Sequence, residues 1–121
     1  DNLHRLRKAG VRVALGSDIA GGNTLSMFQV MDAAAKTALS TGHGVAPLQW
    51  LGLATAGNAD ALGWGQRMGR LAPGYEANVV VVNPGAASEH QTMESLAATL
   101  VHRGDDRMVE ATVVLGRWVF E

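Results

Sequence analysis

The stretch that most constrains the fold is residues 11–22, which read Val-Arg-Val-Ala-Leu-Gly-Ser-Asp-Ile-Ala-Gly-Gly. Its apolar start, Val11–Leu15, predicts a short buried strand that ends at Gly16. Asp18 follows at the carboxyl end of this strand, and Gly21-Gly22 then turns the chain toward a helix. Because α/β folds place catalytic groups at such strand ends, Asp18 is a candidate catalytic residue at the floor of a pocket. The alternative is an aspartate that only caps the turn or the next helix, and the local pattern favours neither.

Composition excludes several classes of protein. The chain has 121 residues, 47% of them apolar and 17% charged, which is typical of a packed globular chain. With a net charge of -1 and a single small basic cluster (Arg5, Arg7, Lys8, Arg12), we expect neither nucleic acid nor a membrane surface as a partner. The absence of cysteine excludes disulfides and thiolate chemistry. Val79–Val82 is too short to cross a bilayer and no signal peptide is seen, so we expect a cytoplasmic protein.

The first 68 residues predict helices around the one strand. A helix over Asp1–Ala9 is expected to stop at Gly10. A second helix begins near Thr24, where Ser26 and Gln29 have the spacing of a capping box and Asn23 or Thr24 is another candidate cap. Its expected buried stripe is Phe28, Met31, Ala35, Ala38 and Leu39, and it ends at Thr41–Gly44.

A third helix is expected to start at Pro47, in the first turn, where proline is favoured. We expect Gly57 to break this helix and Asn58–Leu62 to form another short turn of helix.

The pattern becomes rich in β-strands after Gly69. A turn at 71–74 precedes a strand over Ala77–Val82, and a helix follows over Glu89–Val101. The apolar stripe of that helix is Met93, Leu96, Ala97, Leu100 and Val101. Val109–Leu115 and Arg117–Phe120 then form either a tight hairpin or one strand with a glycine bulge at Gly116. The sequence therefore predicts an α/β chain divided into residues 1–68 and 69–121.

Few other residues carry a recognisable chemistry. The histidines at 4, 43, 90 and 102 lack the spacing of metal ligands, so they are expected to lie scattered on the surface. Neither a Gly-x-Ser-x-Gly elbow nor a Walker loop occurs. The remaining acids are expected in caps, turns and solvated pairs: Asp60, Glu76, Asp105, Asp106 and Glu110. One candidate, Asp18, is left, and one carboxylate is not a mechanism.

Several stretches resemble one known family. Residues 15–27, Leu-Gly-Ser-Asp-Ile-Ala-Gly-Gly-Asn-Thr-Leu-Ser-Met, are similar to the last barrel strand and following loop of the metal-dependent amidohydrolases, and within them to the guanine deaminase branch. Residues 54–63 and 69–81 resemble the helix that leaves the barrel and the return into a small β-sandwich. Residues 104–107 and 116–121 resemble the closing segment of the same branch. The resemblance therefore implies the C-terminal part of a (β/α)8 barrel, in residues 1–68, followed by part of a β-sandwich, in residues 69–121.

The resemblance also implies an activity. Such enzymes convert guanine and water to xanthine and ammonia with a zinc-bound hydroxide, and Asp18 matches the aspartate that is both a metal ligand and the catalytic proton carrier. The other ligands of this one zinc ion are expected upstream of the chain, so the chain alone is expected to be inactive. We expect it to form a homo-oligomer or to associate with a missing N-terminal part. No residue can be assigned to substrate binding.

Three residues differ from the usual residue of the family, and two other functions are possible alternatives. Ser17 stands in place of the usual threonine, Asn78 in place of aspartate, and Ala46 in place of the serine that would cap the helix at Pro47. Another amidohydrolase acting on a triazine, cytosine or adenosine derivative is the first alternative. A non-catalytic α/β module that has lost its site is the second.

Overall fold

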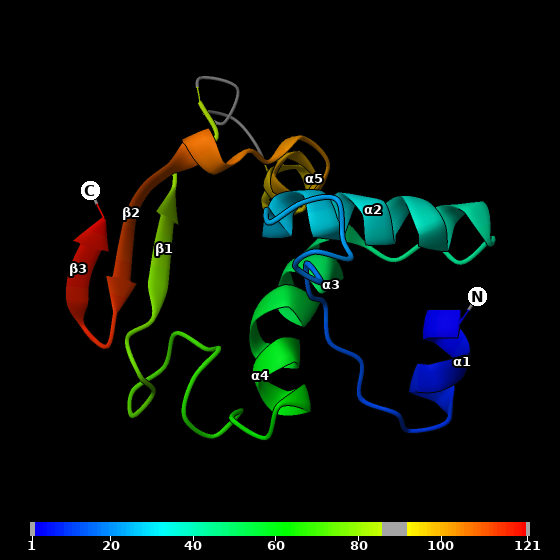
Figure 1. Cartoon of the computed structure of the whole chain (residues 1–121), viewed down its shortest axis with the longest axis horizontal. Coiled ribbons are helices and arrows are strands. Elements are labelled where there is room, and N and C mark those ends of the chain that lie inside the picture. The colour runs from blue at the N-terminus through cyan, green and yellow to red at the C-terminus, as the bar shows by residue number, and fades with distance from the viewer. Residues whose placement is uncertain (1, 86–91, 121) are drawn as a thin grey trace.

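Helices fill one side of the molecule and a small antiparallel sheet stands on the other (Figure 1). The computed structural model describes residues 2–85 and 92–120. The elements in chain order are α1 (Asn2–Lys8), α2 (Met27–Ser40), α3 (Pro47–Gly52), the π turn η1 (Leu53–Gly57), α4 (Asn58–Ala61), β1 (Val79–Val82), α5 (Met93–Arg103), the 3₁₀ turn η3 (Asp106–Met108), β2 (Val109–Val114) and β3 (Arg117–Phe120). Within these ranges no helix combines the length and the apolar character that a bilayer crossing requires.

The core lies where α2, α3 and α5 pack together. Its buried side chains are Met31, Ala35, Ala38, Trp50, Leu53 and Val101. The predicted stripes are confirmed at their centres but wrong at two residues, because Leu39 is 60% exposed and Met93 is 64% exposed. Leu39 lies about 100° around the helix from Ala38 and so leaves the packed face. Met93 is the first residue of α5, and burial along that helix begins only at Leu96.

The helix that begins at Pro47 does not break at Gly57. Pro47 occupies the first turn as predicted, and Ala46 provides no side-chain cap. Gly57 has helical dihedral angles, φ −65° and ψ −40°, so the predicted break is wrong and the helix continues through η1 into α4. A Cβ atom at Gly57 would lie 3.0 Å from Leu53 Cδ1. Glycine therefore lets the wider π turn close around Leu53 instead of ending the helix.

The sheet has the order β1-β2-β3, with both strand pairs antiparallel. Of the two alternatives for the last 13 residues, the hairpin is confirmed. Leu115 and Gly116 form its two-residue turn with φ values of +50° and +78°, the sign that a type I′ turn requires at both positions. The predicted strand at Ala77 begins two residues later, at Val79. All four residues of β3 are exposed.

The predicted starts of two helices lie outside the described residues, and one predicted strand is absent from the described chain. The first helix is confirmed from Asn2, while Asp1 lies outside the described residues. The helix predicted from Glu89 begins at Met93, after the cap Thr92, and residues 89–91 lie outside the described part of the chain. Val11–Leu15 is not a strand, because a strand requires a hydrogen-bonded neighbour and the described chain brings none beside it. This segment runs without regular structure past α4 toward α3 (Figure 1).

Candidate active site

The segment before Asp18 is held to α4 by the Asn58 side chain and by the Asp60 backbone carbonyl. The Leu15 amide donates to Asn58 Oδ1 at 2.7 Å, and Asn58 Nδ2 donates to the Leu15 carbonyl at 2.9 Å. Arg12 Nη1 also donates to the Asp60 carbonyl, at 2.9 Å. A carboxamide offers one donor and one acceptor in the same plane, so Asn58 satisfies both backbone groups of Leu15 as a neighbouring strand would.

The loop that follows turns tightly around Asp18. Asp18 has φ +49° and Ala20 has φ +74°, in the left-handed region that aspartate tolerates better than most residues. The amides of Gly21 and Gly22 both donate to the Asp18 carbonyl. A Cβ atom at Gly21 would lie 2.5 Å from Asp18 Oδ2, and one at Gly22 would lie 1.9 Å from the Ser17 carbonyl oxygen. The predicted glycine turn is therefore present. Gly22 is needed for the loop to close because a side chain there would meet backbone, whereas one at Gly21 would displace the Asp18 carboxylate.

The Asp18 side chain is exposed. Among residues 2–85 and 92–120, no hydrogen bond or ion pair involves its carboxylate, and it caps neither the turn nor α2. Its two oxygens are thus available as hydrogen-bond acceptors, as proton acceptors or as a metal ligand. Whether Asp18 performs catalysis stays a prediction.

The downstream end of the loop is anchored differently from the prediction. Ser26 is the cap residue of α2, yet its side chain makes no capping hydrogen bond, so the predicted capping box with Gln29 is wrong. The buried Ser26 hydroxyl instead donates to Asp106 Oδ1 at 2.7 Å, and the Ser26 amide donates to Thr24 Oγ1 at 3.0 Å. The loop that carries Asp18 is therefore tied upstream to α4 and downstream to η3.

The other acids are structural, as predicted. Asp60 pairs with Arg70 at 2.7 Å and Glu76 with Arg67 at 2.6 Å, and hydrogen bonds from these arginines lower the pKa of each carboxyl. Arg107 donates to Asp105 from its side chain and from its backbone amide, which together lower the pKa of Asp105 to about 2. The remaining two, Asp106 and Glu110, accept hydrogen bonds from Ser26 and Asn83.

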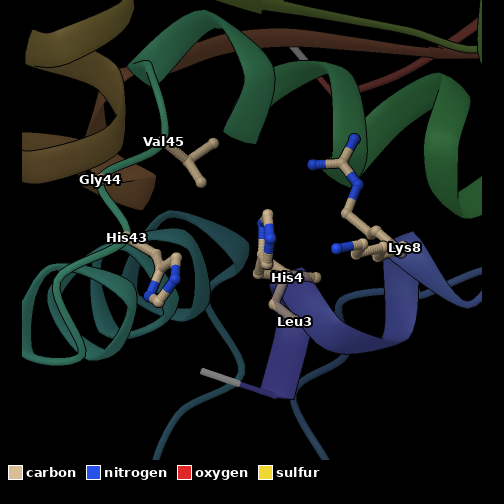
Figure 2. A pocket seen from close by; sticks show the side chains of 7 residues that line it. Leu3, His4, Lys8, His43, Gly44 and Val45 are labelled. Carbon is tan, nitrogen blue, oxygen red and sulfur yellow. The ribbon is translucent and has the colours of Figure 1, made fainter.

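Two of the histidines contact each other, which was not predicted from the sequence. His4 of α1 and His43 of the loop after α2 stack with ring centroids 5.0 Å apart, and both line a cavity of about 330 Å³ with Arg7 and Lys8 (Figure 2). His102 lies elsewhere, 3.1 Å from Asp32, and His90 is outside the described residues. Asp18 does not line this cavity.

The described residues include no group of three His, Asp or Glu side chains that could hold a metal ion. A zinc site needs three or four converging ligands. The described residues therefore do not form a complete site, and on the predicted loop Asp18 is an exposed carboxylate that could contribute a single ligand.

The sequence matches the model of the Amidohydrolase family over residues 1–119. The chain belongs to this family. It is 34% identical to guanine deaminase of Escherichia coli over 99% of its length, and its fold matches that enzyme's structure with a TM-score of 0.92. It is also 34% identical, over 97% of its length, to 5-methylthioadenosine/S-adenosylhomocysteine deaminase of Syntrophomonas wolfei. A crystal structure of a Xanthomonas campestris adenosine deaminase with bound zinc matches 95% of the chain, with a TM-score of 0.81 and 28% identity.

This amidohydrolase chain spans less than a third of the length of the relatives named above. It covers 29% of the E. coli enzyme, 28% of the S. wolfei enzyme and 27% of the X. campestris structure. The comparisons thus confirm the resemblance to amidohydrolases and guanine deaminases and an amidohydrolase-like α/β fold.

Sequence reasoning missed two residues that hold the Asp18 loop, Asn58 and Asp106. Both lie in stretches that the resemblance covers, but the sequence predicts Asn58 only in a short helical turn and Asp106 only among caps, turns and solvated pairs. Asn58 follows a glycine inside a helix, where asparagine is a poor helix former, and this local cost was a usable signal. Asp106 contacts a residue 80 positions away, so no local pattern could have shown its partner.

Proposed function

We propose that the protein carrying this chain is a hydrolytic deaminase that converts guanine and water to xanthine and ammonia. The observation that carries the proposal is the exposed Asp18 carboxylate, without a partner in the described chain, on a loop that Asn58 and Asp106 hold at its two ends. The 34% identity to E. coli guanine deaminase across 99% of the chain supports guanine as the substrate.

Asp18 would act by moving protons. Water attacks the purine carbon that bears the exocyclic amine, and a carboxylate oxygen of Asp18 accepts the proton that the water loses. Asp18 then donates a proton to the amine, which leaves as ammonia while the ring carbon keeps the oxygen. General acid–base transfer of this kind contributes about 10²–10⁴ in rate.

Zinc is the cofactor that we propose for the complete protein, by analogy with the zinc-bound relative from X. campestris. A bound zinc ion would lower the pKa of its water and so supply hydroxide near neutral pH. Since the described residues offer no cluster of three ligands, the ion would require ligands from elsewhere in the protein, with Asp18 as one of them.

We further propose that residues 1–68 belong to a (β/α)8 barrel and residues 69–121 to a small β-sandwich. In this arrangement Val11–Leu15 becomes a barrel strand once neighbouring strands are present, with Asn58 already satisfying the Leu15 backbone. The exposed sheet would be covered either by more chain or by a second copy.

An adenosine-type substrate is the second candidate. The chain shares 34% identity with the S. wolfei 5-methylthioadenosine/S-adenosylhomocysteine deaminase over 97% of its length, the same percentage as with the guanine deaminase. Both reactions replace an amine on a purine ring with oxygen, so the role proposed for Asp18 is the same in either.

Ammonia release by the complete protein tests the proposal. We expect turnover of guanine to exceed that of 5-methylthioadenosine, adenosine and cytosine, and Asp18→Asn to lower kcat by at least about 10²-fold. Glu110→Gln retains an acceptor for Asn83 at the sheet, away from the Asp18 loop, and is the matched control, with kcat near that of the native protein. Higher turnover of an adenosine derivative would favour the second candidate. Equal activity of Asp18→Asn would favour the non-catalytic module or a different residue.

A further inference from the structure

The position of Asp18 depends on what holds the chain just before it. Only two residues separate Leu15 from Asp18, and one of them, Gly16, has open space where a side chain would be. No side-chain packing at Gly16 therefore fixes the direction of the loop. The nearest upstream anchor is the pair of hydrogen bonds between Leu15 and Asn58.

We propose that Asn58 is a positioning residue for Asp18, an inference that rests on the proposed function. Its carboxamide binds Leu15 through two antiparallel bonds of 2.7 Å and 2.9 Å, both partly buried. Two bonds to one residue fix its translation and its rotation, whereas one bond would leave the peptide free to swing. Asn58 thereby sets the point from which the chain reaches Asp18.

The helix that contains Asn58 determines the direction of its side chain. The π turn Leu53–Gly57 lies immediately before Asn58 and connects α3, which buries Trp50, to α4, which buries Ala59. A π turn holds one residue more than an α turn. Removing that extra residue would rotate Asn58 by about 100° around the helix axis. The turn thus keeps Trp50 and Leu53 in the core while Asn58 faces Leu15.

The chain offers a matched control in Asn78. Its Oδ1 accepts a hydrogen bond from the Leu115 amide at 2.9 Å, so it also uses a carboxamide to hold a backbone turn. Asn78 lies at the sheet, and its partner is the turn between β2 and β3. Loss of this asparagine tests stability without touching the segment before Asp18.

The experiment compares Asn58→Leu, Asn58→Asp and Asn78→Leu in the complete protein, well below the melting temperature. Asn58→Leu is expected to lower kcat by about 10- to 100-fold with little change in KM, because misplacing a catalytic group slows the chemical step more than binding. Asn58→Asp keeps the acceptor for the Leu15 amide but places an oxygen against the Leu15 carbonyl. The decrease in kcat of this variant should therefore be smaller than that of Asn58→Leu. Asn78→Leu should lower the melting temperature and leave kcat within about twofold.

Two further measurements separate positioning from a merely structural role. Hydrogen exchange at the Leu15 amide should accelerate at least about fivefold in Asn58→Leu and not in Asn78→Leu. In an Asp18→Asn background, Asn58→Leu should cause no additional loss of kcat, because two residues that act through one group are not additive.

Three results would overturn the positioning role. Unchanged kcat in Asn58→Leu, with Asp18→Asn inactive, would overturn it while leaving the proposed function intact. An equal fold-loss from Asn58→Leu with and without Asp18 would show that Asn58 acts elsewhere. Full turnover by Asp18→Asn would instead overturn the proposed role of Asp18, and the positioning role with it.

Discussion

At the scale of single residues, two asparagines replace backbone partners that the chain does not otherwise provide. Asn58 pairs with Leu15, and Asn78 accepts from the Leu115 amide while donating to Glu76 Oε2 at 3.2 Å. The resemblance to the amidohydrolases implies aspartate at position 78. An aspartate could still accept from Leu115, but it would place a second carboxylate against Glu76. The asparagine therefore keeps the turn contact and avoids that repulsion.

Trp50 allows a test of core packing at one side chain. It is 2% exposed and borders a cavity of about 360 Å³, and its indole nitrogen is buried without a hydrogen-bond partner in the described chain. Trp50→Phe removes that unsatisfied donor, so we expect the free energy of unfolding to change by less than about 1.5 kcal/mol. Trp50→Ala should cost about 3–5 kcal/mol. Urea denaturation measures both, and equal losses would contradict this interpretation.

The ion pair of Asp105 and Arg107 predicts that the stability of the folded state depends on pH in the acid range. Because hydrogen bonds from Arg107 lower the pKa of Asp105 from 3.8 to about 2, the ionised carboxylate stabilises the folded state. This contribution is complete above pH 4 and is lost as the pH falls from about 4 to about 2. Arg107→Met should raise the pKa of Asp105 toward 3.8, measured by carboxyl ¹³C chemical shift against pH, with Arg117→Met as the control. An unmoved titration in Arg107→Met would show that another group sets the pKa.

At the scale of elements, sequence periodicity succeeded where local rules decide the structure. The centres of α2 and α5, the proline at the start of α3 and the Leu115-Gly116 hairpin follow from helical spacing, fixed φ and turn chemistry. Val11–Leu15 failed as a strand because pairing depends on a neighbour, not on the segment itself. The predicted helix break at Gly57 is wrong because this glycine takes helical dihedral angles within a continuous run of helix over residues 47–61.

The loop of the candidate site could be predicted in part, because local sequence determines a tight turn. Asp18 and its glycine turn are encoded locally, and the structure shows both. The groups that hold the loop, Asn58 and Asp106, act across 43 and 80 residues of sequence. Such partners emerge only once helices and sheet have assembled.

The hairpin turn between β2 and β3 predicts opposite effects at neighbouring positions. Leu115 has φ +50°, which strains a leucine, whereas asparagine is favoured at this position of a type I′ turn. Leu115→Asn should raise the free energy of unfolding by up to about 1 kcal/mol. Gly116→Ala, at φ +78°, should lower it by about 1 kcal/mol or more. Denaturation midpoints of both variants check this, and a loss in Leu115→Asn would contradict the assigned turn.

At the scale of the whole molecule, the sheet stands apart from the helical core with apolar side chains on the surface (Figure 1). Trp118, Val119 and Phe120 of β3 are all more than half exposed. Exposed apolar strands at a sheet edge favour association with another chain. The 121-residue chain produced alone should therefore self-associate in sedimentation velocity experiments, and Trp118→Thr with Phe120→Thr should reduce this. A compact monomer at all concentrations would contradict the proposal that more chain covers the sheet.

The most direct measurement is a crystal structure of the complete protein with a tetrahedral analogue of guanine hydration bound. We expect an Asp18 carboxylate oxygen within about 2.6–3.2 Å of the analogue's hydroxyl, with Asn58 still bound to both backbone groups of Leu15. An Asp18 side chain turned away from the ligand, with another residue in contact with that hydroxyl, would contradict it.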